Sequence, residues 1–429
     1  MKVGAAATEI TPPIGMAMDG YGARASGAVG VHDPLFVRVL VAEGADGIAV
    51  GLVVADLLYV VPDLQTTIVE GIERATGIGR DRLQLIGTHT HSGPDLAEPS
   101  EARAAVARTI VSTVEEAWAA RRPAVAAVGL GRVAGIGANR RPHGGPVDDR
   151  VTVARFDDAD GRPIATLVNY GCHPTTLGPD NLLYSADYPG VACKAIETVL
   201  GGVALFTTGP QGDVNPGGYS PEGSMVGVVV PWRTFESAGR YGQLVAECAV
   251  EVHERLRTGP ANGVWAEAQV VELARKPLPD AARARAATDL ASAAEVAVRE
   301  AGLSPDAMYH ASVAAAYADL IAEQAADPGR DGPVRIRISA LGIGPLTHVG
   351  VQGELFVALG QQIRARLDEE RTCIAVLCDG TVGYIPTADA FAEGGYEPNA
   401  SVLVTGEGER LVEAVVELAG GRVGASRTG

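Results

Sequence analysis

The chain has 429 residues, of which 47% are hydrophobic and 20% are charged, and its formal charge is −17. This amount of apolar material supports a large core and excludes a disordered chain. The acidic balance argues against nucleic acid and anionic membranes as partners, because both are bound through Lys and Arg. We therefore expect a soluble protein with a small or cationic partner, and a small-molecule substrate is the predicted one.

The N-terminal segment and the cysteines predict a cytoplasmic protein. Thr8 and Glu9 interrupt the first apolar run, so no secretory h-region of about 7–15 apolar residues is present. The longest apolar stretch, residues 48–55, is far shorter than the ~20 residues of a membrane helix, and no membrane insertion is expected. The cysteines are scattered and odd in number, which fits a reducing compartment better than a disulfide framework. They are Cys172, Cys193, Cys248, Cys373 and Cys378.

In the first half of the chain, apolar runs typical of buried strands alternate with helical patterns. The predicted strands cover residues 48–54, 83–87, 124–133, 151–156, 164–170 and 203–207. The predicted helices cover residues 62–75, 101–119 and 188–200. This alternation predicts an α/β core in which the ends of strands lead into loops.

The second half continues with helices at 234–257 and 354–367, a pair of helices within 280–326, and a closing helix at 408–418. Strands are predicted at 264–273, 333–341 and 373–377; in the second, Ile336 and Ile338 alternate with Arg335 and Arg337, as in an edge or half-exposed strand. No linker forces a boundary. We predict an α/β fold in one domain, residues 1–425, with a single large mixed sheet surrounded by helices.

Two histidine clusters follow predicted strands. His89 and His91 lie two apart after residues 83–87, so on an extended backbone both side chains face one side. The simpler interpretation gives one of them to a metal and the other to the substrate or to a supporting role; the alternative is a polar loop with exposed histidines. His173 ends another strand and is held extended by Pro174, which suits a metal ligand or a core histidine. Its neighbour Cys172 is predicted to be a small core residue.

Three further segments carry weaker signals. The glycine-rich loop 209–218 follows a strand and could turn its N–H groups toward an oxyanion, although a flexible surface loop is an equal alternative. Glu354 opens a predicted helix after a glycine, where a carboxylate commonly interacts with the helix dipole. Tyr384 lies between a glycine and an apolar residue, as packing tyrosines often do.

Taken together and in this order, these segments resemble the catalytic domain of the neutral/alkaline, non-lysosomal ceramidases. The resemblance extends from residues 8–13 to about residue 401, and its most specific pieces are residues 87–94 and 212–214. Residues 30–35, residues 139–142 and the pair Tyr396-Glu397 add support.

The resemblance implies a ceramidase-like fold and a zinc ion held by His89, His173, Glu354 and Tyr384. It also implies that His91 and Arg140 hold the scissile group or the product. The set is chemically sensible, because imidazole and carboxylate are common zinc ligands.

One position departs from the family. Ceramidases carry an essential serine after Gly-Asp-Val, and here that position is Asn215. An amide cannot be the nucleophile, but it can donate a hydrogen bond to an oxyanion. The chain also lacks the family's secretion signal and immunoglobulin-like C-terminal domain, so ceramide is not the expected substrate.

We therefore predict a zinc-dependent hydrolase, an amidase, in which water activated by the metal attacks a carbonyl group. Arg140, Asn215 or the N–H groups of the loop containing Gly212 and Asp213 would stabilise the oxyanion, and His91 would pass a proton to the leaving amine. Arg140 could instead bind a substrate carboxylate. An esterase or lactonase, an amide-forming cyclase and a non-catalytic binding protein are the alternatives, and the sequence leaves open whether the chain forms a homo-oligomer.

Overall fold

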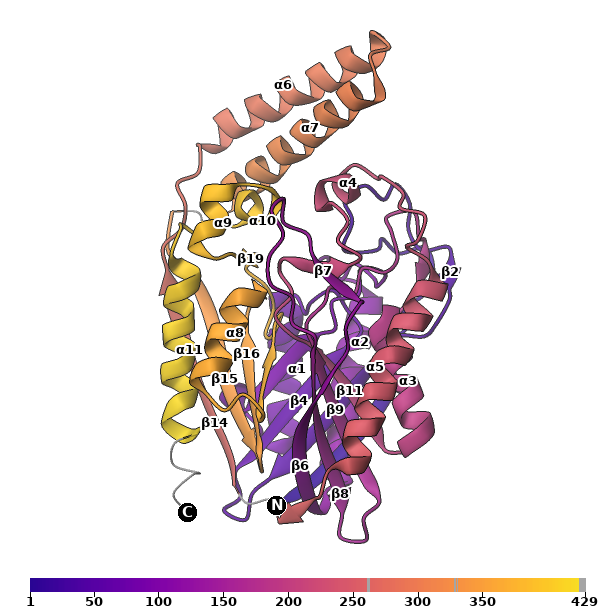
Figure 1. Ribbon diagram of the computed structural model, residues 1–429, viewed down its shortest axis with the longest axis vertical. Coiled ribbons are helices and arrows are strands. Elements are labelled where there is room, and N and C mark those ends of the chain that lie inside the picture. The colour runs from indigo at the N-terminus through magenta and orange to yellow at the C-terminus, as the bar shows by residue number, and fades with distance from the viewer. Residues whose placement is uncertain (261–262, 328, 330, 424–429) are drawn as a thin grey trace.

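The computed structural model describes residues 1–260, 263–327, 329 and 331–423. Within these residues the strands form a nine-stranded sheet, a four-stranded sheet and three short two-stranded pairs. Helices surround the two larger sheets (Figure 1). The predicted fold class, an α/β fold with a large mixed sheet and surrounding helices, is thus confirmed.

The large sheet has the strand order β11-β9-β8-β6-β1-β3-β4-β5, with β13 beside β6. Neighbours are parallel in the pairs β9–β11 and β4–β5 and antiparallel elsewhere along this order, which makes the sheet mixed. Strands β1 and β6 join its two halves through only two residue pairs. The bounds are β1 Lys2–Glu9, β3 Phe36–Glu43, β4 Ala49–Ala55, β5 Leu83–Gly87, β6 Arg122–Arg132, β8 Arg150–Asp158, β9 Pro163–Tyr170, β11 Val203–Thr208 and β13 Gly259–Pro260.

The second sheet has the order β14-β15-β16-β18 and corrects one prediction. Its strands are β14 Val264–Leu273, β15 Val334–Ile343, β16 Leu346–Val351 and β18 Thr372–Ala375. Strand β15 pairs with β14 on one side and β16 on the other, so it is an interior strand and not an edge. Only its first residues alternate between buried and exposed, because the rest of the strand is covered on both faces.

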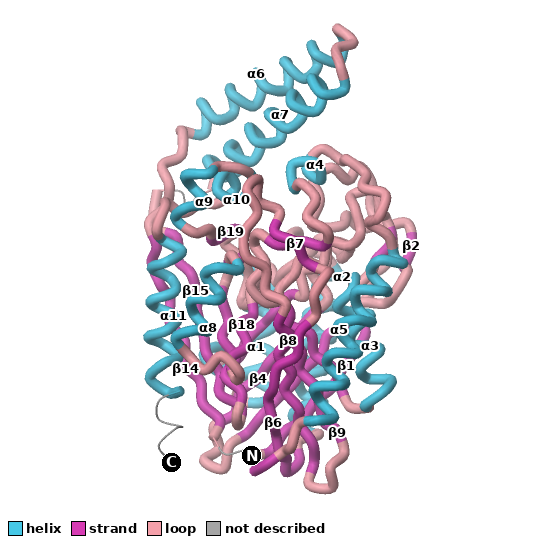
Figure 2. The backbone as a smooth tube through the Cα atoms, viewed as in Figure 1, coloured by secondary structure: helices cyan, strands magenta, loops and turns pink. Residues whose placement is uncertain are grey.

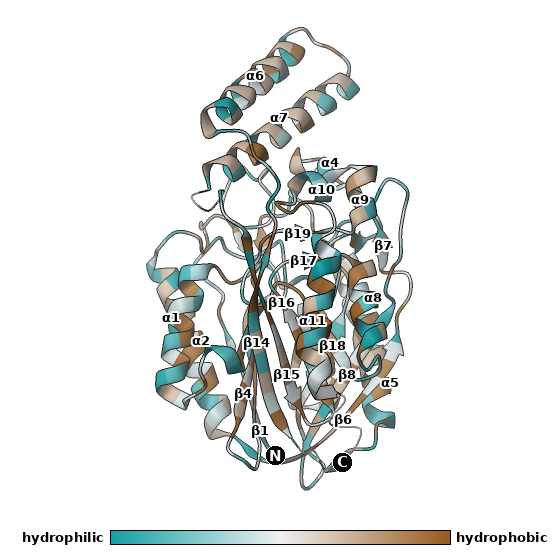
Figure 3. Cartoon of the chain, turned by 90° about the vertical axis from the view of Figure 1, so that its left-hand side faces the viewer, coloured by the Kyte–Doolittle hydropathy of each residue, from teal (hydrophilic) through white to brown (hydrophobic). Residues whose placement is uncertain are grey.

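The inner faces of both sheets share one core, and helices cover the outer faces. Val3, Leu40 and Phe156 of the large sheet pack in the same cluster as Leu341 and Cys373 of the second sheet. Outside, three helix pairs complete the core, and Figure 3 shows the first and the last of them on opposite sides of the sheets. These pairs are α1 Pro62–Thr76 with α2 Glu101–Ala119, α3 Asp187–Leu200 with α5 Phe235–Arg255, and α8 Val357–Arg366 with α11 Glu407–Val423.

The end of the molecule opposite the chain termini carries the loops and the short elements (Figure 2). They include α4 Pro221–Met225, α9 Ala388–Glu393, α10 Tyr396–Ala400 and the strand pairs β2 Gly30–Val31 with β10 Leu183–Tyr184, β7 Gly137–Asn139 with β12 Val214–Pro216, and β17 Glu354–Leu355 with β19 Tyr384–Ile385. A helical hairpin, α6 Ala281–Glu300 and α7 Pro305–Ala326, projects from this end (Figure 1). Among the described residues, no helix is both long enough and apolar enough to cross a membrane.

Candidate metal and active site

Loops from both sheets meet at the end of the molecule that carries the short elements. The hydroxyl of Thr208, the last residue of β11, donates to the Thr88 carbonyl at 2.7 Å, which ties the loop after β5 to β11. The Gly212 amide donates to the Leu355 carbonyl at 3.0 Å and links the glycine-rich loop to β17. The Asp379 amide donates to the Leu85 carbonyl at 2.6 Å. These bonds place the predicted site residues on one rigid framework.

His89 and His91 both reach the site, but not through the extended backbone that the two-residue spacing suggested. His89 has φ 71°, in the left-handed region, where a non-glycine residue is uncommon. The preceding Gly87 permits this turn, because a Cβ there would lie 2.8 Å from the Leu58 carbonyl oxygen. The strand therefore ends at Gly87, and the chain bends so that the Nε2 atoms of both imidazoles face each other, 3.3 Å apart.

Each of the three site histidines uses Nδ1 to bind the backbone. His89 Nδ1 lies 3.1 Å from the Leu58 carbonyl oxygen, and His91 Nδ1 lies 3.0 Å from that of Gly20. His173 Nδ1 lies 2.8 Å from the Gln211 carbonyl oxygen and 2.9 Å from that of Val214. A carbonyl oxygen only accepts, so Nδ1 must carry the proton and Nε2 of each neutral ring presents a lone pair.

These three lone pairs converge with a carboxylate. His89 Nε2 lies 3.3 Å from His91 Nε2 and 3.4 Å from Glu354 Oε2, and His173 Nε2 lies 2.9 Å from the same oxygen. The ligand atoms of His89, His91 and His173 lie within 4.8 Å of one another. Lone pairs that face one another repel unless a cation lies between them, and three imidazoles with one carboxylate are a donor set that zinc accepts. The residues present therefore fit the predicted metal.

The short parallel pair β17–β19 brings Glu354 and Tyr384 to the site. Their Cα atoms are register partners in this pair, so residues 30 positions apart lie side by side. The prediction that Glu354 begins a helix is wrong: Glu354 belongs to β17, and α8 begins at Val357. The chain continues after Gly353 as a strand and not as a helix. The Glu354 side chain therefore points toward the histidines and does not interact with the end of a helix.

The charges of the site follow from burial. Burial lowers the pKa of His91 well below its usual value, and the neighbouring His89 and His173 lower it further. Burial and the Arg140 charge lower the pKa of His173 to about 4, so this ring is neutral at pH 7. Burial alone would raise the pKa of Glu354, but His89 and His173 hold it well below its usual range. The Glu354 carboxylate therefore stays ionised beside the neutral rings of His91 and His173.

Arg140 is positioned beside this cluster by four other groups. Its Nε donates to Glu397 Oε1 at 2.8 Å, and its Nη2 donates to the Gly212 carbonyl at 2.9 Å and to the Tyr384 hydroxyl at 3.2 Å. The Arg140 amide also donates to the Asp213 carbonyl at 2.9 Å. Glu397 is buried and accepts a second bond from Arg141, so the guanidinium of Arg140 is fixed.

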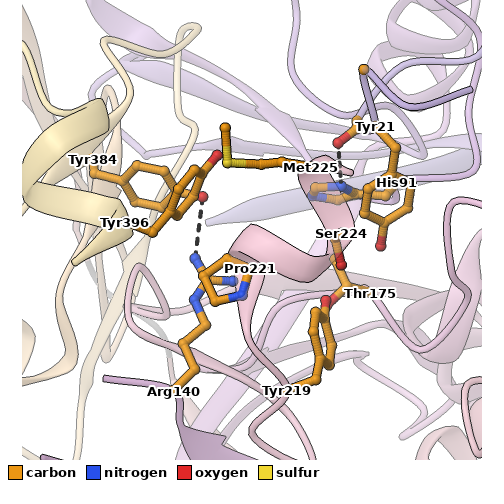
Figure 4. A pocket seen from close by; sticks show the side chains of 12 residues that line it. Tyr21, His91, Arg140, Thr175, Tyr219, Pro221, Ser224, Met225, Tyr384 and Tyr396 are labelled. Atoms are coloured by element: carbon orange, nitrogen blue, oxygen red, sulfur yellow. Dashed lines mark hydrogen bonds between the residues drawn. The ribbon is translucent and has the colours of Figure 1, made fainter. Parts of the chain in front are cut away.

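A cavity of about 100 Å³ opens next to Arg140 and His91. Figure 4 shows Tyr384 and Tyr396 on one side of it and Tyr21 and His91 on the other. Its lining residues are Gly20, Tyr21, Gly22, His91, Arg140, Thr175, Tyr219, Pro221, Ser224, Met225, Tyr384 and Tyr396. Of the residues singled out from the sequence for the site, His91, Arg140 and Tyr384 line the cavity.

Asn215, Gly212 and Asp213 lie behind the cavity and are not among the residues that line it. The Asn215 amide donates to the Tyr219 carbonyl at 2.9 Å, so it supports a tyrosine that does line the cavity. The two Asp213 oxygens accept from the Val357 amide at 2.9 Å and from Asn139 Nδ2 at 2.7 Å. Burial raises the pKa of Asp213 to about 6. In this structure these residues position the walls of the site.

Cys172 is buried, and burial raises the pKa of its thiol well above the usual value, as expected of a core residue. All five cysteines are unpaired. Sequence reasoning missed Tyr21, Tyr219 and Met225, which line the cavity. None of them stands in a motif with recognisable spacing, so no local signal identified them.

The fold and the site together define a mixed α/β protein with a histidine-rich centre of the metal-binding type. The sequence matches the family model "Neutral/alkaline non-lysosomal ceramidase, N-terminal" over residues 1–221, more than half of the chain. The protein belongs to this family, as the resemblance in the sequence indicated. Glu354 and Tyr384 lie beyond the matched residues.

The similarity to individual relatives is distant. Neutral ceramidase A of Dictyostelium discoideum is 24% identical over 242 residues, which cover 48% of this chain and 34% of that protein. The neutral ceramidase of Drosophila melanogaster is 22% identical over 307 residues, covering 63% of this chain and 42% of that one. The match thus spans less than half the length of either relative. The crystal structure of neutral ceramidase from Pseudomonas aeruginosa has a TM-score of 0.75 at 19% identity over 97% of this chain and 74% of that chain, so the fold is shared.

Proposed function

We propose that this protein is a zinc-dependent hydrolase of an amide bond in a small molecule. The observation that carries the proposal is the convergence of the His89 and His173 Nε2 atoms with the Glu354 carboxylate, next to a cavity that His91 lines. Membership of a family named for amide-cleaving enzymes supports the same reaction class. We assign His89, His173 and Glu354 as metal ligands, with Tyr384 as the fourth ligand that the family resemblance implies.

Zinc, when bound, polarises a carbonyl oxygen and activates water at neutral pH. The other groups of the site are this chain's own. Arg140 carries a fixed positive charge beside the cavity, where it can bind an anionic group of the substrate. His91 lines the cavity and is neutral at pH 7, so its Nε2 can exchange a proton with the substrate. The oxygen of water joins the carbonyl carbon, the C–N bond breaks, and the nitrogen leaves with a proton.

Metal analysis tests the proposal directly. The purified protein is expected to bind about one zinc ion per chain, and His89→Ala and His173→Ala are expected to lose it, because a site of this kind uses all of its ligands. His310→Ala is the control, since His310 is exposed on α7. A chelator should lower the melting temperature of the wild type but not of the two ligand variants, because bound metal stabilises the folded state.

Equal zinc in the wild type and both ligand variants would contradict the assignment. A zinc-loaded protein that hydrolyses no amide, but binds small acids in the cavity, would favour the non-catalytic alternative. Hydrolysis of esters but not of the matching amides would identify an esterase that uses the same site.

A further inference from the structure

The cavity next to the histidines is small and carries one sign of charge. Its volume of about 100 Å³ is below the ~150 Å³ of an engineered cavity that holds benzene, and well below the ~300–1,000 Å³ of pockets for drug-sized ligands. Its lining includes Arg140 but no aspartate, glutamate or lysine. A group of about six non-hydrogen atoms fills such a space, and an anionic group suits its charge.

Arg140 has one nitrogen to spare for a ligand. Its Nε and Nη2 are used by Glu397, Gly212 and Tyr384, whereas Nη1 has no acceptor among the residues that the structure describes. The phenols of Tyr219 and Tyr396, neither of which is assigned to the metal, lie around the same space (Figure 4). A guanidinium N–H held in place with phenol groups around it is a donor set for a carboxylate.

The charge also indicates which part of an amide substrate enters the cavity. Hydrolysis yields a carboxylate from the acyl part and an amine that is protonated at pH 7. Arg140 is paired with the buried Glu397, but no carboxylate lines the cavity itself, and this arrangement favours the acyl part over the ammonium group.

The wall formed by α4 is fixed from two sides. Pro221, Ser224 and Met225 of α4 line the cavity. From inside, Arg233 donates to the Ser224 hydroxyl at 3.0 Å and to the Thr175 carbonyl at 3.1 Å. This buried arginine therefore joins two parts of the cavity wall to each other.

From outside, the helical hairpin braces the same wall. The Tyr317 hydroxyl on α7 donates to Glu222 of α4 at 3.1 Å, and the Tyr317 ring lies 6.4 Å from that of Tyr396 on α10. Gln324 Nε2 on α7 donates to the Ala400 carbonyl at 2.7 Å. Because α4 and Tyr396 both line the cavity, helix α7 contacts two parts of the cavity wall through Tyr317.

A larger groove of about 780 Å³ lies across the loop at Gly20, Tyr21 and Gly22, which line both spaces. None of His89, His91, His173 and Glu354 is among the residues that line this groove. The Gly20 carbonyl of this loop binds His91 Nδ1, so the loop lies on the Nδ1 side of the ring. An acyl chain in the larger groove would therefore be separated by the loop from His91 Nε2.

We propose that the substrates are small amides whose acyl part is short and carries a carboxylate that binds Arg140, and that Tyr317, by bracing α4, sets the limit on acyl length. This inference rests on the proposed amide hydrolysis and narrows its substrate class. It separates this chain from a hydrolase of long-chain acyl amides.

A series of 4-nitroanilides tests the inference, because all share one leaving amine. The acyl groups are acetyl, butyryl, octanoyl and succinyl; butyryl and succinyl have four carbons each and differ in charge. In the zinc-loaded wild type, kcat/KM for succinyl is expected to exceed that for butyryl by ~10-fold or more, the effect of one charge-assisted hydrogen bond. Octanoyl is expected to fall below butyryl by ~10-fold or more, because overfilling a packed site is unfavourable.

Variants assign these preferences to residues. Arg140→Gln should bring the succinyl-to-butyryl ratio close to one, whatever its effect on the absolute rate. Tyr317→Phe, which loses only the hydroxyl that binds Glu222, and Met225→Ala, which enlarges the cavity, should each raise the octanoyl-to-butyryl ratio. Tyr309→Phe is the matched control on the same helix and should leave both ratios unchanged, since the Tyr309 ring packs on His310.

Binding decides the inference even if none of the anilides is cleaved. Calorimetry on the zinc-loaded protein should show that succinate binds at least ~10-fold more tightly than butyrate or octanoate. The inference is overturned if the wild type has a higher kcat/KM for the octanoyl than for the succinyl anilide, or binds octanoate more tightly than succinate. It is also overturned if kcat/KM is equal for the succinyl and butyryl anilides and succinate and butyrate bind equally. Tight succinate binding without any hydrolysis would instead overturn the proposed function and leave the ligand class standing.

Discussion

Each of the three histidines of the site donates a hydrogen bond from Nδ1 to a backbone carbonyl oxygen. This anchoring sets the tautomer and the direction of the ring before any metal arrives, so a metal does not have to order the side chains. The anchoring carbonyls belong to Leu58, Gly20 and Gln211, each in a different loop. The loops therefore determine the site as much as the ligands do.

Asn215 takes a different role in the structure from the one that its position suggested. Its side-chain nitrogen already donates to the Tyr219 carbonyl, and its Oδ1 accepts from no donor among the described residues. Arg140, whose Nη1 has no acceptor among the described residues, lines the cavity and can bind an anionic group of the substrate. Asn215, which stands where the family has a serine, therefore supports the cavity wall through Tyr219. The oxyanion role that we predicted for Asn215 stays a prediction.

A histidine outside the site makes the fold sensitive to acid. His348 is buried in β16, its Nδ1 donates to Gln84 Oε1 at 2.7 Å, and burial lowers its pKa to about 3. The unfolded chain binds a proton below about pH 6.5 and the folded chain does not, so stability falls as the pH drops from 6.5 toward 3. We expect His348→Asn to reduce the loss of unfolding free energy between pH 6.5 and pH 5 by up to about 2 kcal/mol, at about 1.4 kcal/mol per pH unit.

Urea unfolding at the two pH values, with a chelator present, measures this loss without a contribution from metal. His310→Asn, at an exposed position on α7, should retain the wild-type loss. An unchanged loss in His348→Asn would show that His348 is protonated in the folded protein.

At the scale of elements, the glycine-rich loop sets the position of Glu354. A Cβ on Gly212 would lie 2.5 Å from the Glu354 carbonyl oxygen and 2.9 Å from the Phe356 ring. Gly212→Ala should therefore displace β17, weaken zinc binding by ~10–100-fold as changes behind a metal ligand do, and destabilise the fold by about 1–3 kcal/mol. Zinc titration and urea unfolding measure the two effects separately.

Gly239→Ala is the control for that change. A Cβ on Gly239, within α5, meets nothing within 4 Å, and alanine is the better helix residue. This variant should keep its zinc affinity and gain about 0.5–1 kcal/mol of stability. Wild-type zinc affinity in Gly212→Ala would mean that the loop can move away without moving Glu354.

The helices and many strands were predictable because their patterns are local. Strands β5 and β14 and helix α2 have the predicted bounds. Gly77, at the C-cap of α1, and Ser100, at the N-cap of α2, are residue types that commonly end and begin helices. Strands β1, β3 and β16 were missed. Strands β3 and β16 are buried on both faces for most of their length, so no alternation marks them, and β1 is rich in glycine and alanine.

The residue types of the site were predictable, but its geometry was not. The order of the segments around His89, His173 and Glu354 carried the family resemblance. The left-handed turn at His89, the pairing of Glu354 with Tyr384 and the cavity wall from α4 depend on contacts between distant residues. Such contacts leave no periodic signal in one sequence.

At the scale of the whole molecule, the helical hairpin is an insertion between two neighbouring strands. Leu273 at the end of β14 and Val334 at the start of β15 are register partners, so the chain leaves the sheet and returns to it at the same place. Helices α6 and α7 each bury only two residues, and none of the four core clusters draws a described residue from them. The core of the protein is thus built without the hairpin.

Removing the hairpin should therefore leave a folded protein with altered selectivity. Residues 277–332 can be replaced by a short Gly/Ser linker, because antiparallel register partners lie only about 5 Å apart. Lys276 stays, since its amide donates to the Val402 carbonyl at 2.8 Å. We expect one cooperative unfolding transition, unchanged zinc content and an octanoyl-to-butyryl ratio raised at least as far as in Tyr317→Phe, because α4 has lost its outer brace. A truncated protein that does not fold would show that the hairpin belongs to the folding unit, and a folded one with wild-type selectivity would show that Arg233 alone fixes the cavity wall.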